Sequence, residues 1–362
     1  MRSKWRVDKM AFEFFILSMT LGQILFCLSQ LARRVQNQPS YLPLMLFFLA
    51  NLIVALGPAV QSLANNYYLW YMAAIFPAWL SMGPALFLYV AGLTSKRAWH
   101  VRRRDLIHFI PCLFGVALAL AIVQLSSELQ SAIFFDEQEV ESGYGLFVVL
   151  GMFAAMLTWL VQSTAYVVAI VTRLIRYRRG LKDVFASTEQ RELTWIFWLL
   201  AVIVCTWALS ASNLILTLGA QTTAIGANGS AVCMLVLIWT LGYWGLRQKP
   251  GFEPLNAIEN NNEQVTAERV EEAHSSINQK YQKSVLSQAQ SERIAAKLEQ
   301  AMQEQSLYLE SDLTLHALAK ALVVSPNYLS QTINEYLDSN FFDYVNGWRI
   351  QHALPQVLEG NR

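Results

Sequence analysis

The sequence has 362 residues, of which 54% are hydrophobic and only 15% are charged, and its formal net charge is +1. Its mean hydropathy is +0.32, and a soluble domain of this length would not tolerate so much apolar surface, so the composition excludes an ordinary soluble protein. Apolar runs crowd the first 246 residues and the rest is polar. We predict an all-α protein with a membrane region over 1–246, a linker and connector over 247–290, and a cytoplasmic helical domain over 291–362.

Seven apolar segments are long enough to cross a membrane, because a hydrocarbon core about 30 Å thick takes roughly 20 residues of helix. They predict a polytopic bundle of about seven helices over 11–31, 41–63, 69–93, 106–125, 145–172, 193–218 and 228–246. Membrane helices tolerate proline, because neighbouring groups satisfy the freed carbonyls. We therefore expect kinks and not breaks at Pro43, Pro58, Pro77, Pro84 and Pro111.

The loop charges predict the orientation, because Lys and Arg resist translocation and stay on the cytoplasmic side. The second, fourth and sixth loops contain no Lys or Arg, and the fourth is acidic. The first, third and fifth loops are basic, through Arg33 and Arg34, then Lys96, Arg97, Arg102, Arg103 and Arg104, then Arg173, Arg176, Arg178, Arg179, Lys182 and Arg191. The C-terminal domain is then cytoplasmic and the N terminus lies outside.

The N-terminal tail opposes this orientation, because Arg2, Lys4, Arg6 and Lys9 would have to be translocated. Three basic loops outweigh one short tail. Translation from Met10 would remove the tail altogether.

Polar residues inside the predicted spans are candidates for a signal-binding site, because such groups are costly in lipid. Glu13 is acidic, but it lies near a helix end, where an interfacial position explains it. Five uncharged residues could line a ligand cavity, although hydrogen bonds between helices explain them equally well: Gln23, Asn51, Gln61, Gln162 and Asn213. Four tryptophans near span ends predict an aromatic belt: Trp70, Trp159, Trp195 and Trp244.

The sequence shows none of the patterns that an enzyme would need. There is no phosphate-binding glycine loop and no nucleophile beside a base. The histidines are scattered, and all four cysteines lie in apolar runs, where a small buried side chain is the simpler interpretation. We predict a non-enzymatic protein without a cofactor or metal.

The polar region begins with a predicted flexible linker over 248–264, which has prolines, glycine and three consecutive asparagines but no apolar periodicity. The stretch 265–286 has a partly helical pattern. It is a candidate for self-association into a homodimer, although its apolar repeat is too thin for a coiled coil. From Ser291 a packed domain begins, with an apolar helix face made by Ile294, Leu298 and Met302.

The segment 313–353 has the outline of a helix-turn-helix unit. A first short helix would turn Leu315, Leu318, Ala319 and Leu322 inward. Ser325 is a good N-cap and Pro326 a favoured first helical residue, so a second helix starts there. That helix would bury Leu329 and Ile333, with Tyr336 as a third candidate.

The second helix would expose side chains able to reach base edges or phosphates if it entered a major groove, namely Asn327, Tyr328, Ser330, Gln331 and Asn334. An ordinary helical hairpin with a polar outer face explains the pattern equally well.

The segments LTLHALAKALVVSPNYLSQTIN and FFDYVNGWRIQHA resemble the first helix-turn-helix and the connecting helix of AraC/XylS-type regulators, over about the last seventy residues. The preceding KYQKSVLSQAQSERIAAKLEQAM and LYLESDLTL are similar to the lead-in of bacterial proteins that join this domain to a multi-helix membrane region. The resemblance implies DNA binding by two helix-turn-helix units in a protein of the bacterial inner membrane. It also implies that Ala319 is the small residue of the motif, that Ser325 and Pro326 open the recognition helix, and that Arg349 is the arginine of the connecting helix.

The chain departs from the family pattern at three places. Val323 stands where the family usually has a turn glycine, so we expect a tighter or differently shaped turn. Pro355 is expected to interrupt the connecting helix. The sequence stops at Arg362, where a second helix-turn-helix should begin, which favours a fragment of a longer protein.

These observations predict a one-component sensor that receives a small-molecule or lipid signal in the membrane and binds DNA in the cytoplasm. The domain from Ser291 onward has five basic and nine acidic residues, and DNA affinity comes largely from basic side chains. A receptor whose helical domain binds a protein partner is therefore the alternative. A transporter would need paired intramembrane charges or internal repeats, and the sequence shows neither.

Overall fold

The computed structural model describes residues 2–96, 99–135, 143–189, 191–218, 224–248 and 287–359. Within these residues the regular elements are helices, apart from one isolated β-bridge. The all-α prediction is confirmed for this part of the chain. The chain forms two compact units, which are Met1–Arg173 with Thr194–Glu253, and Leu174–Leu193 with Pro254–Arg362. The predicted linker and connector lie almost wholly outside the described residues.

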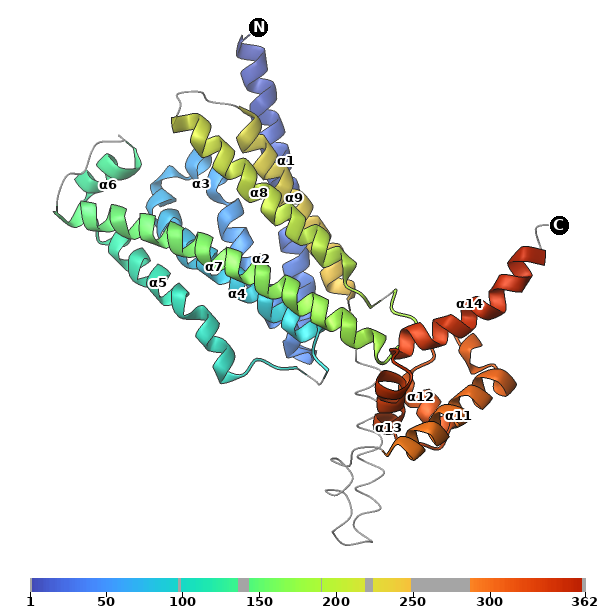
Figure 1. The fold of residues 1–362 in the computed structure, drawn as a ribbon. Helices are drawn as coiled ribbons and strands as arrows, with labels where there is room; N and C mark the ends of the chain where they lie inside the picture. Colours follow the sequence, from blue (N-terminus) through green and yellow to red (C-terminus); the bar gives the residue numbers. More distant parts are fainter. Residues whose placement is uncertain are drawn as a thin grey trace. The chain divides into compact units, whose positions relative to one another are not determined.

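The first unit consists of apolar helices joined by short 3-10 turns. Its described elements are α1 (Arg2–Asn37), η1 (Pro39–Tyr41), α2 (Leu42–Ala55), α3 (Gly57–Leu63), η2 (Asn65–Tyr67), α4 (Tyr68–Leu93), η3 (Arg103–Phe109), α5 (Ile110–Val123), α6 (Ser127–Phe134), most of α7 (Gly143–Lys182), α8 (Thr194–Leu218) and α9 (Ala224–Arg247). Helix α4 packs against α2 and α5, α1 packs against α2 and α9, and α8 lies beside α9 (Figure 1).

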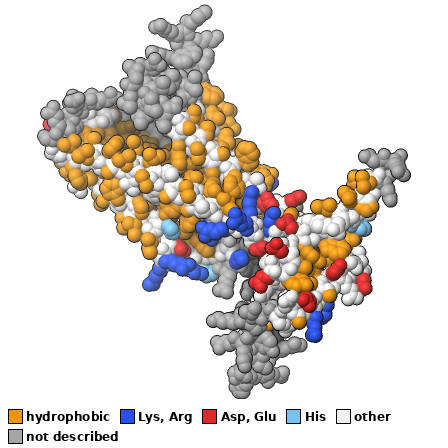
Figure 2. Space-filling view, viewed as in Figure 1, with side chains coloured by type: hydrophobic (Ala, Val, Ile, Leu, Met, Phe, Trp, Pro, Cys, Tyr) orange, Lys and Arg blue, Asp and Glu red, His pale blue; other side chains and the backbone are white. Residues whose placement is uncertain are grey.

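Five helical segments are long and apolar enough to cross a membrane: Phe14–Gln36, Pro39–Leu63, Asn65–Leu93, Arg103–Val123 and Gly143–Lys182. The sixth and seventh predicted spans coincide with shorter apolar stretches, Thr194–Leu209 and Ala231–Arg247. Hydrophobic side chains cover much of the face shown in Figure 2, and Phe15, Val161 and Trp198 are 60%, 71% and 71% exposed. A monomer in water rarely exposes so much apolar surface, so these helices fit a membrane protein.

The prolines have three different effects. Pro77 and Pro84 lie inside α4, which continues through both, as expected. Pro43 and Pro111 lie in the first turns of α2 and α5, where the missing N–H costs no helical hydrogen bond. Pro58 lies in the first turn of α3, and Leu56 is the single turn residue between α2 and α3 within the predicted helix 41–63. The Leu56 amide donates to Leu52 O at 3.1 Å and the Val60 amide donates to Leu56 O at 2.9 Å, so the helical hydrogen bonds continue across this point, as expected of a kink.

Two further elements differ from the sequence prediction in this unit. The start of the fourth predicted span is the 3-10 helix η3, and the α-helix begins only at Ile110. The acidic fourth loop contains α6, whose N-cap Ser126 accepts a hydrogen bond from the Leu129 amide.

The described C-terminal part of the second unit contains α11 (Gln288–Gln305), η5 (Leu307–Leu309), α12 (Leu315–Ala321), α13 (Pro326–Gln331), the π-helical turn η6 (Thr332–Tyr336) and α14 (Phe341–Glu359). Ser287 and Gln290 form a capping box at the start of α11. Leu298 and Met302 of α11 are fully buried and Ile294 packs against the same core. This confirms the predicted apolar face of that helix.

Helix α14 continues through Pro355 to Glu359. The predicted interruption of this helix was therefore wrong. Residues 351–358 of α14 are exposed, so the helix is free to bend away from the proline ring, although it loses one backbone donor there.

Candidate functional site

The segment predicted to form a helix-turn-helix unit starts with α12, whose N-cap Thr314 accepts a hydrogen bond from the Ala317 amide at 3.1 Å. Leu315, Leu318 and Ala319 are buried as predicted. The small side chain of Ala319 is completely covered, and α12 packs against α13. These contacts fix the spacing of the two helices.

The turn between them is a Schellman motif centred on Val323. The Val324 amide donates to Ala319 O at 2.9 Å and the Val323 amide donates to Lys320 O at 3.2 Å. Val323 has φ +56°, a left-handed conformation that glycine adopts without a penalty but a β-branched residue does not. Val323 therefore adopts the backbone conformation that a turn glycine adopts at this position of a Schellman motif.

Helix α13 begins at Pro326 after the N-cap Ser325, as predicted. Leu329 and Ile333 are fully buried, whereas Tyr336 is 43% exposed. The π-helical turn η6 accommodates an extra residue per turn, so Leu337 packs against the core in place of Tyr336. The prediction that Tyr336 might be buried was wrong for this reason.

The structure brings six of the seven predicted DNA-binding residues together along α13 and η6 and the N-cap before them. Ser325, Asn327 and Asn334 are exposed, and Tyr328, Ser330 and Gln331 are partly buried. Gln331 Nε2 donates to Glu335 Oε2 at 2.8 Å, and Asn334 Nδ2 donates to Ser330 Oγ at 3.4 Å. The amide groups of Gln331 and Asn334 therefore form hydrogen bonds within the helix, which a base edge would have to replace.

Arg349, the seventh predicted residue, lies on α14 and contacts acceptors of its own unit. Its guanidinium donates to Tyr308 O at 2.7 Å, Glu310 O at 2.6 Å, Ala186 O at 3.2 Å and Asn346 Oδ1 at 3.2 Å. Arg349 thus joins α14 to the turn around η5 and to residues far earlier in the sequence.

Those earlier residues form the α7–α8 segment, Leu174–Leu193, which belongs to the second unit. Phe185 and Thr314 form an antiparallel bridge, in which the Ala186 amide donates to Leu313 O at 3.1 Å and the Leu315 amide donates to Val184 O at 2.9 Å. Ala186 is 1% exposed and is part of the C-terminal core.

Side chains of α14 also hold this segment. Asn346 Nδ2 donates to Ala186 O at 3.0 Å, and Lys182 Nζ lies 5.1 Å from the centroid of the Phe342 ring. Sequence reasoning missed this packing. The signal was the short apolar run at 184–186 inside an otherwise polar loop.

The α7–α8 segment changes the charge of the C-terminal unit. It adds five basic residues against three acidic ones, and its basic residues are Arg176, Arg178, Arg179, Lys182 and Arg191. Residues 254–290 of the same unit carry five acidic and three basic residues, which offset this gain, so the whole unit keeps the acidic excess of four counted from Ser291 onward.

A large cavity lies within the first unit, with a volume of about 750 Å³. Its lining comes from seven helices and includes Thr20 of α1, Asn51 of α2, Gln61 of α3, Trp79 of α4, Trp159 and Ser163 of α7, Thr206 of α8 and Met234 of α9. Trp159 is therefore part of the cavity wall.

The candidate polar residues of the spans divide into two groups. Asn51 and Gln61 line the cavity, as the sequence allowed. Gln23 Nε2 lies 3.6 Å from Cys27 Sγ, and Gln162 Nε2 donates to Leu80 O at 2.9 Å, so these two make contacts within the bundle. The side chains of Glu13 and Asn213 lie outside the described part of the structure.

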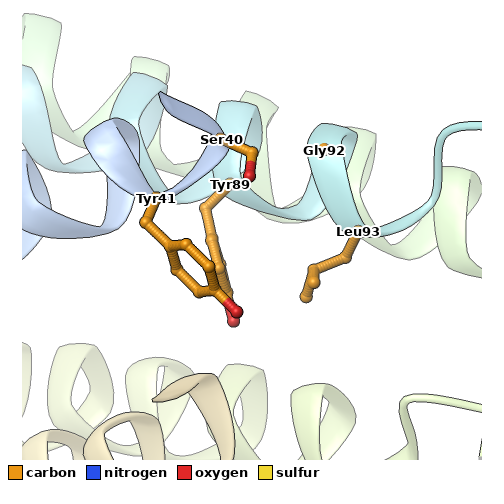
Figure 3. A pocket seen from close by; sticks show the side chains of 5 residues that line it. All are labelled: Ser40, Tyr41, Tyr89, Gly92 and Leu93. Carbon is orange, nitrogen blue, oxygen red and sulfur yellow. The ribbon is translucent and has the colours of Figure 1, made fainter. Parts of the chain in front are cut away.

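A second, much smaller cavity of about 20 Å³ lies beside Ser40, Tyr41, Tyr89, Gly92 and Leu93 (Figure 3). It has room for about one water molecule. The Tyr89 hydroxyl donates to Gly245 O at 2.9 Å, and the Tyr41 hydroxyl donates to Gln248 O at 3.3 Å. Arg34 donates to Leu246 O. These groups satisfy carbonyls at the C-terminal end of α9, so the site holds that helix end.

Comparisons of the chain with protein-family models, curated proteins and solved structures find no match. The function therefore has to be argued from the two sites themselves.

Proposed function

We propose that the chain is a membrane-tethered, one-component transcription regulator. A bundle of about seven membrane helices receives a signal, and the C-terminal unit binds DNA through α12 and α13. The observation that carries the proposal is a Schellman turn after α12 followed by a row of polar side chains along α13 and η6. This polar row consists of Asn327, Tyr328, Ser330, Gln331 and Asn334. This arrangement suits a helix that enters a major groove, where Asn and Gln can recognise adenine.

The α7–α8 segment supports a cytoplasmic location for the C-terminal unit. Its arginines favour the cytoplasmic side of a membrane. Because the bridge between Phe185 and Thr314 packs this loop and the C-terminal helices into one unit, both belong on the same side. The basic first and third loops of the membrane region favour the same side.

The same packing supports a route for signalling. The second unit is continuous in the chain with α7 and α8 through Leu174 and Leu193, besides its connection at Pro254. A signal that displaces α7 would then act on the C-terminal core through Ala186 as well as through the linker.

The test is selection of binding sites from a random double-stranded DNA library with the purified full-length chain in nanodiscs. A specific regulator enriches one sequence, and Gln331→Ala combined with Asn334→Ala abolishes that enrichment. Gln351→Ala, an exposed substitution on α14, is the control. Failure to enrich any sequence from the library would contradict the proposal.

The alternative function is a membrane receptor whose C-terminal unit binds a protein partner. Ile350, Leu354 and Val357 of α14 are 64%, 57% and 67% exposed and lie at helical spacing on one side. An exposed apolar stripe of this kind is typical of a surface that another helix covers. Failure of the chain to enrich any DNA sequence would favour this alternative, and Leu354→Ser, which makes the stripe more polar, should then abolish binding of the partner.

A further inference from the structure

The large cavity of the first unit has the dimensions of a small-molecule site. Its volume of about 750 Å³ lies within the roughly 300 to 1,000 Å³ that is usual for ligand pockets. Most of the lining is apolar, and none of the described lining residues carries a charge. An ionised ligand would therefore lose its hydration without gaining an opposite charge, so the cavity suits an uncharged molecule.

One wall of the cavity is aromatic. The Trp79 and Trp159 rings lie 5.8 Å apart with an interplanar angle of 35°, and the Trp159 and Trp207 rings lie 6.3 Å apart with an angle of 75°. All three line the cavity. Such a wall favours a flat ring, which can stack on one indole and contact the edge of another.

Two threonine hydroxyl groups of the cavity donate to their own helices. Thr20 Oγ1 donates to Ile16 O at 2.8 Å and Thr206 Oγ1 donates to Val202 O at 2.8 Å. Each hydroxyl has one hydrogen and two lone pairs, so the group that each threonine can offer to a ligand is an acceptor oxygen.

Asn51 adds a mixed group to the cavity lining. Its Nδ2 donates to Phe47 O at 2.8 Å, which leaves the side-chain carbonyl as an acceptor and a second N–H as a donor. A ligand hydroxyl can both donate and accept, so it matches this set of groups better than an ether or a hydrocarbon.

We propose that the cavity binds an uncharged, mostly apolar molecule that carries a ring and a hydroxyl group, of which an alkylphenol is the simplest example. The inference names the chemical class of the signal. That the bound molecule acts as a signal rests on the proposed function. Binding itself is measured without DNA, so a chain that binds the probe but selects no DNA would refute the regulator and leave this inference standing.

The test uses three probes with the purified full-length chain in nanodiscs of one lipid composition, with empty nanodiscs to subtract partitioning. The probes are 4-octylphenol, its methyl ether and 4-octylbenzoate. The expected result is saturable binding of the phenol about tenfold tighter than binding of either other probe, because a hydrogen bond in an apolar site is worth about this much. Equal affinity of the phenol and its ether would overturn the inference.

Variants connect the effect to the cavity. Thr20→Val, Asn51→Leu and Thr206→Val each remove one acceptor with little change in side-chain volume. The variant that lacks the acceptor of the phenol hydroxyl should bind the phenol about tenfold more weakly and the ether with unchanged affinity. Thr164→Val is the matched control, because this exposed threonine also donates to its own helix, at 2.9 Å to Leu160 O, and does not line the cavity. If none of the three variants changes the ratio of phenol to ether affinity, the inference is wrong.

A cavity-filling variant gives a second measure. Ser163→Phe places a larger side chain into the space and should abolish saturable binding of both the phenol and the ether, while the melting temperature of the empty protein reports whether the fold persists. Unchanged phenol binding in a folded Ser163→Phe protein would also overturn the inference.

Discussion

Ala186 and Arg349 meet through a hydrogen bond of 3.2 Å from the Arg349 guanidinium to the Ala186 carbonyl, although one residue lies in the loop after α7 and the other in α14. The same guanidinium binds Tyr308 O and Glu310 O. One side chain therefore holds three separate parts of the C-terminal unit together.

Replacing Arg349 with methionine should loosen the α7–α8 segment from this unit. The substitution keeps most of the length of the side chain but removes its donors, so the backbone pairing around Phe185 and Thr314 loses its support. We expect amide hydrogen exchange in peptides covering 183–187 and 312–318 to rise about tenfold, since each lost hydrogen bond contributes about 1 kcal/mol. Gln351→Met, on the exposed side of α14, is the control. Unchanged exchange in the Arg349→Met protein would show that the bridge is stable without the arginine.

The turn at Val323 gives a stabilising substitution. Valine at φ +56° is strained, and its side chain is 87% exposed, so it contributes little to burial. Val323→Gly should raise the free energy of unfolding of the C-terminal unit by about 1 kcal/mol, after the entropic cost of glycine in the unfolded chain. The midpoint of chemical denaturation, followed by hydrogen exchange of α12, measures the change. Val323→Asn should fall between the two, and a Val323→Gly protein no more stable than the parent would contradict the strain.

The polar row on α13 and η6 is tested by affinity for the selected DNA site. Gln331→Ala and Asn334→Ala should each weaken binding of the specific site by about 1 to 3 kcal/mol and leave affinity for random DNA nearly unchanged, because neither residue carries charge. Fluorescence anisotropy at fixed salt concentration measures both. Leu329→Ala is the folding control, because Leu329 is fully buried and its truncation should cost roughly 2 to 5 kcal/mol of stability.

Intact specific binding and promoter output in the Gln331→Ala and Asn334→Ala proteins would show that this helix does not contact bases. The protein-partner alternative would then take precedence.

The orientation is tested by reporter fusions. A reporter fused after Leu246 should be active only in the cytoplasm, and one inserted near Gln138 should be active only outside, because the fourth loop is acidic and lacks Lys and Arg. Alkaline phosphatase and a fluorescent protein make a complementary pair of reporters. The reverse pattern would overturn both the orientation and the regulator proposal.

Local patterns in the sequence predicted local structure well. The stripe of Leu298 and Met302, the start of α13 at Pro326 and the burial of Leu329 all follow from helical periodicity and capping, which act over a few residues. The prediction that Tyr336 is buried was wrong because a π-helical turn changes the number of residues per turn within the helix. Periodicity alone cannot anticipate such a turn.

The packing of the α7–α8 segment and the lining of the large cavity depend on long-range contacts, which no local sequence pattern carries. The contact between Ala186 and Arg349 joins residues that are distant in the chain. The sequence pattern of the loop showed only its basic charge, which predicted a cytoplasmic side and no packing partner. Likewise, the sequence offered five polar candidates for a cavity, but only packing could separate Asn51, which lines it, from Gln162, which binds a neighbouring helix.

The α7–α8 segment makes the C-terminal unit discontinuous in the chain, and this affects its biosynthesis. Val184, Phe185 and Ala186 leave the ribosome well before α11 to α14, on the order of ten seconds earlier at the usual rates of translation. The unit cannot complete its core until the later helices arrive, after the membrane helices that surround this loop in the sequence have been made. Its folding is therefore tied to that of the membrane region, and the C-terminal helices cannot be exchanged between proteins as a self-contained cassette without the loop that completes them.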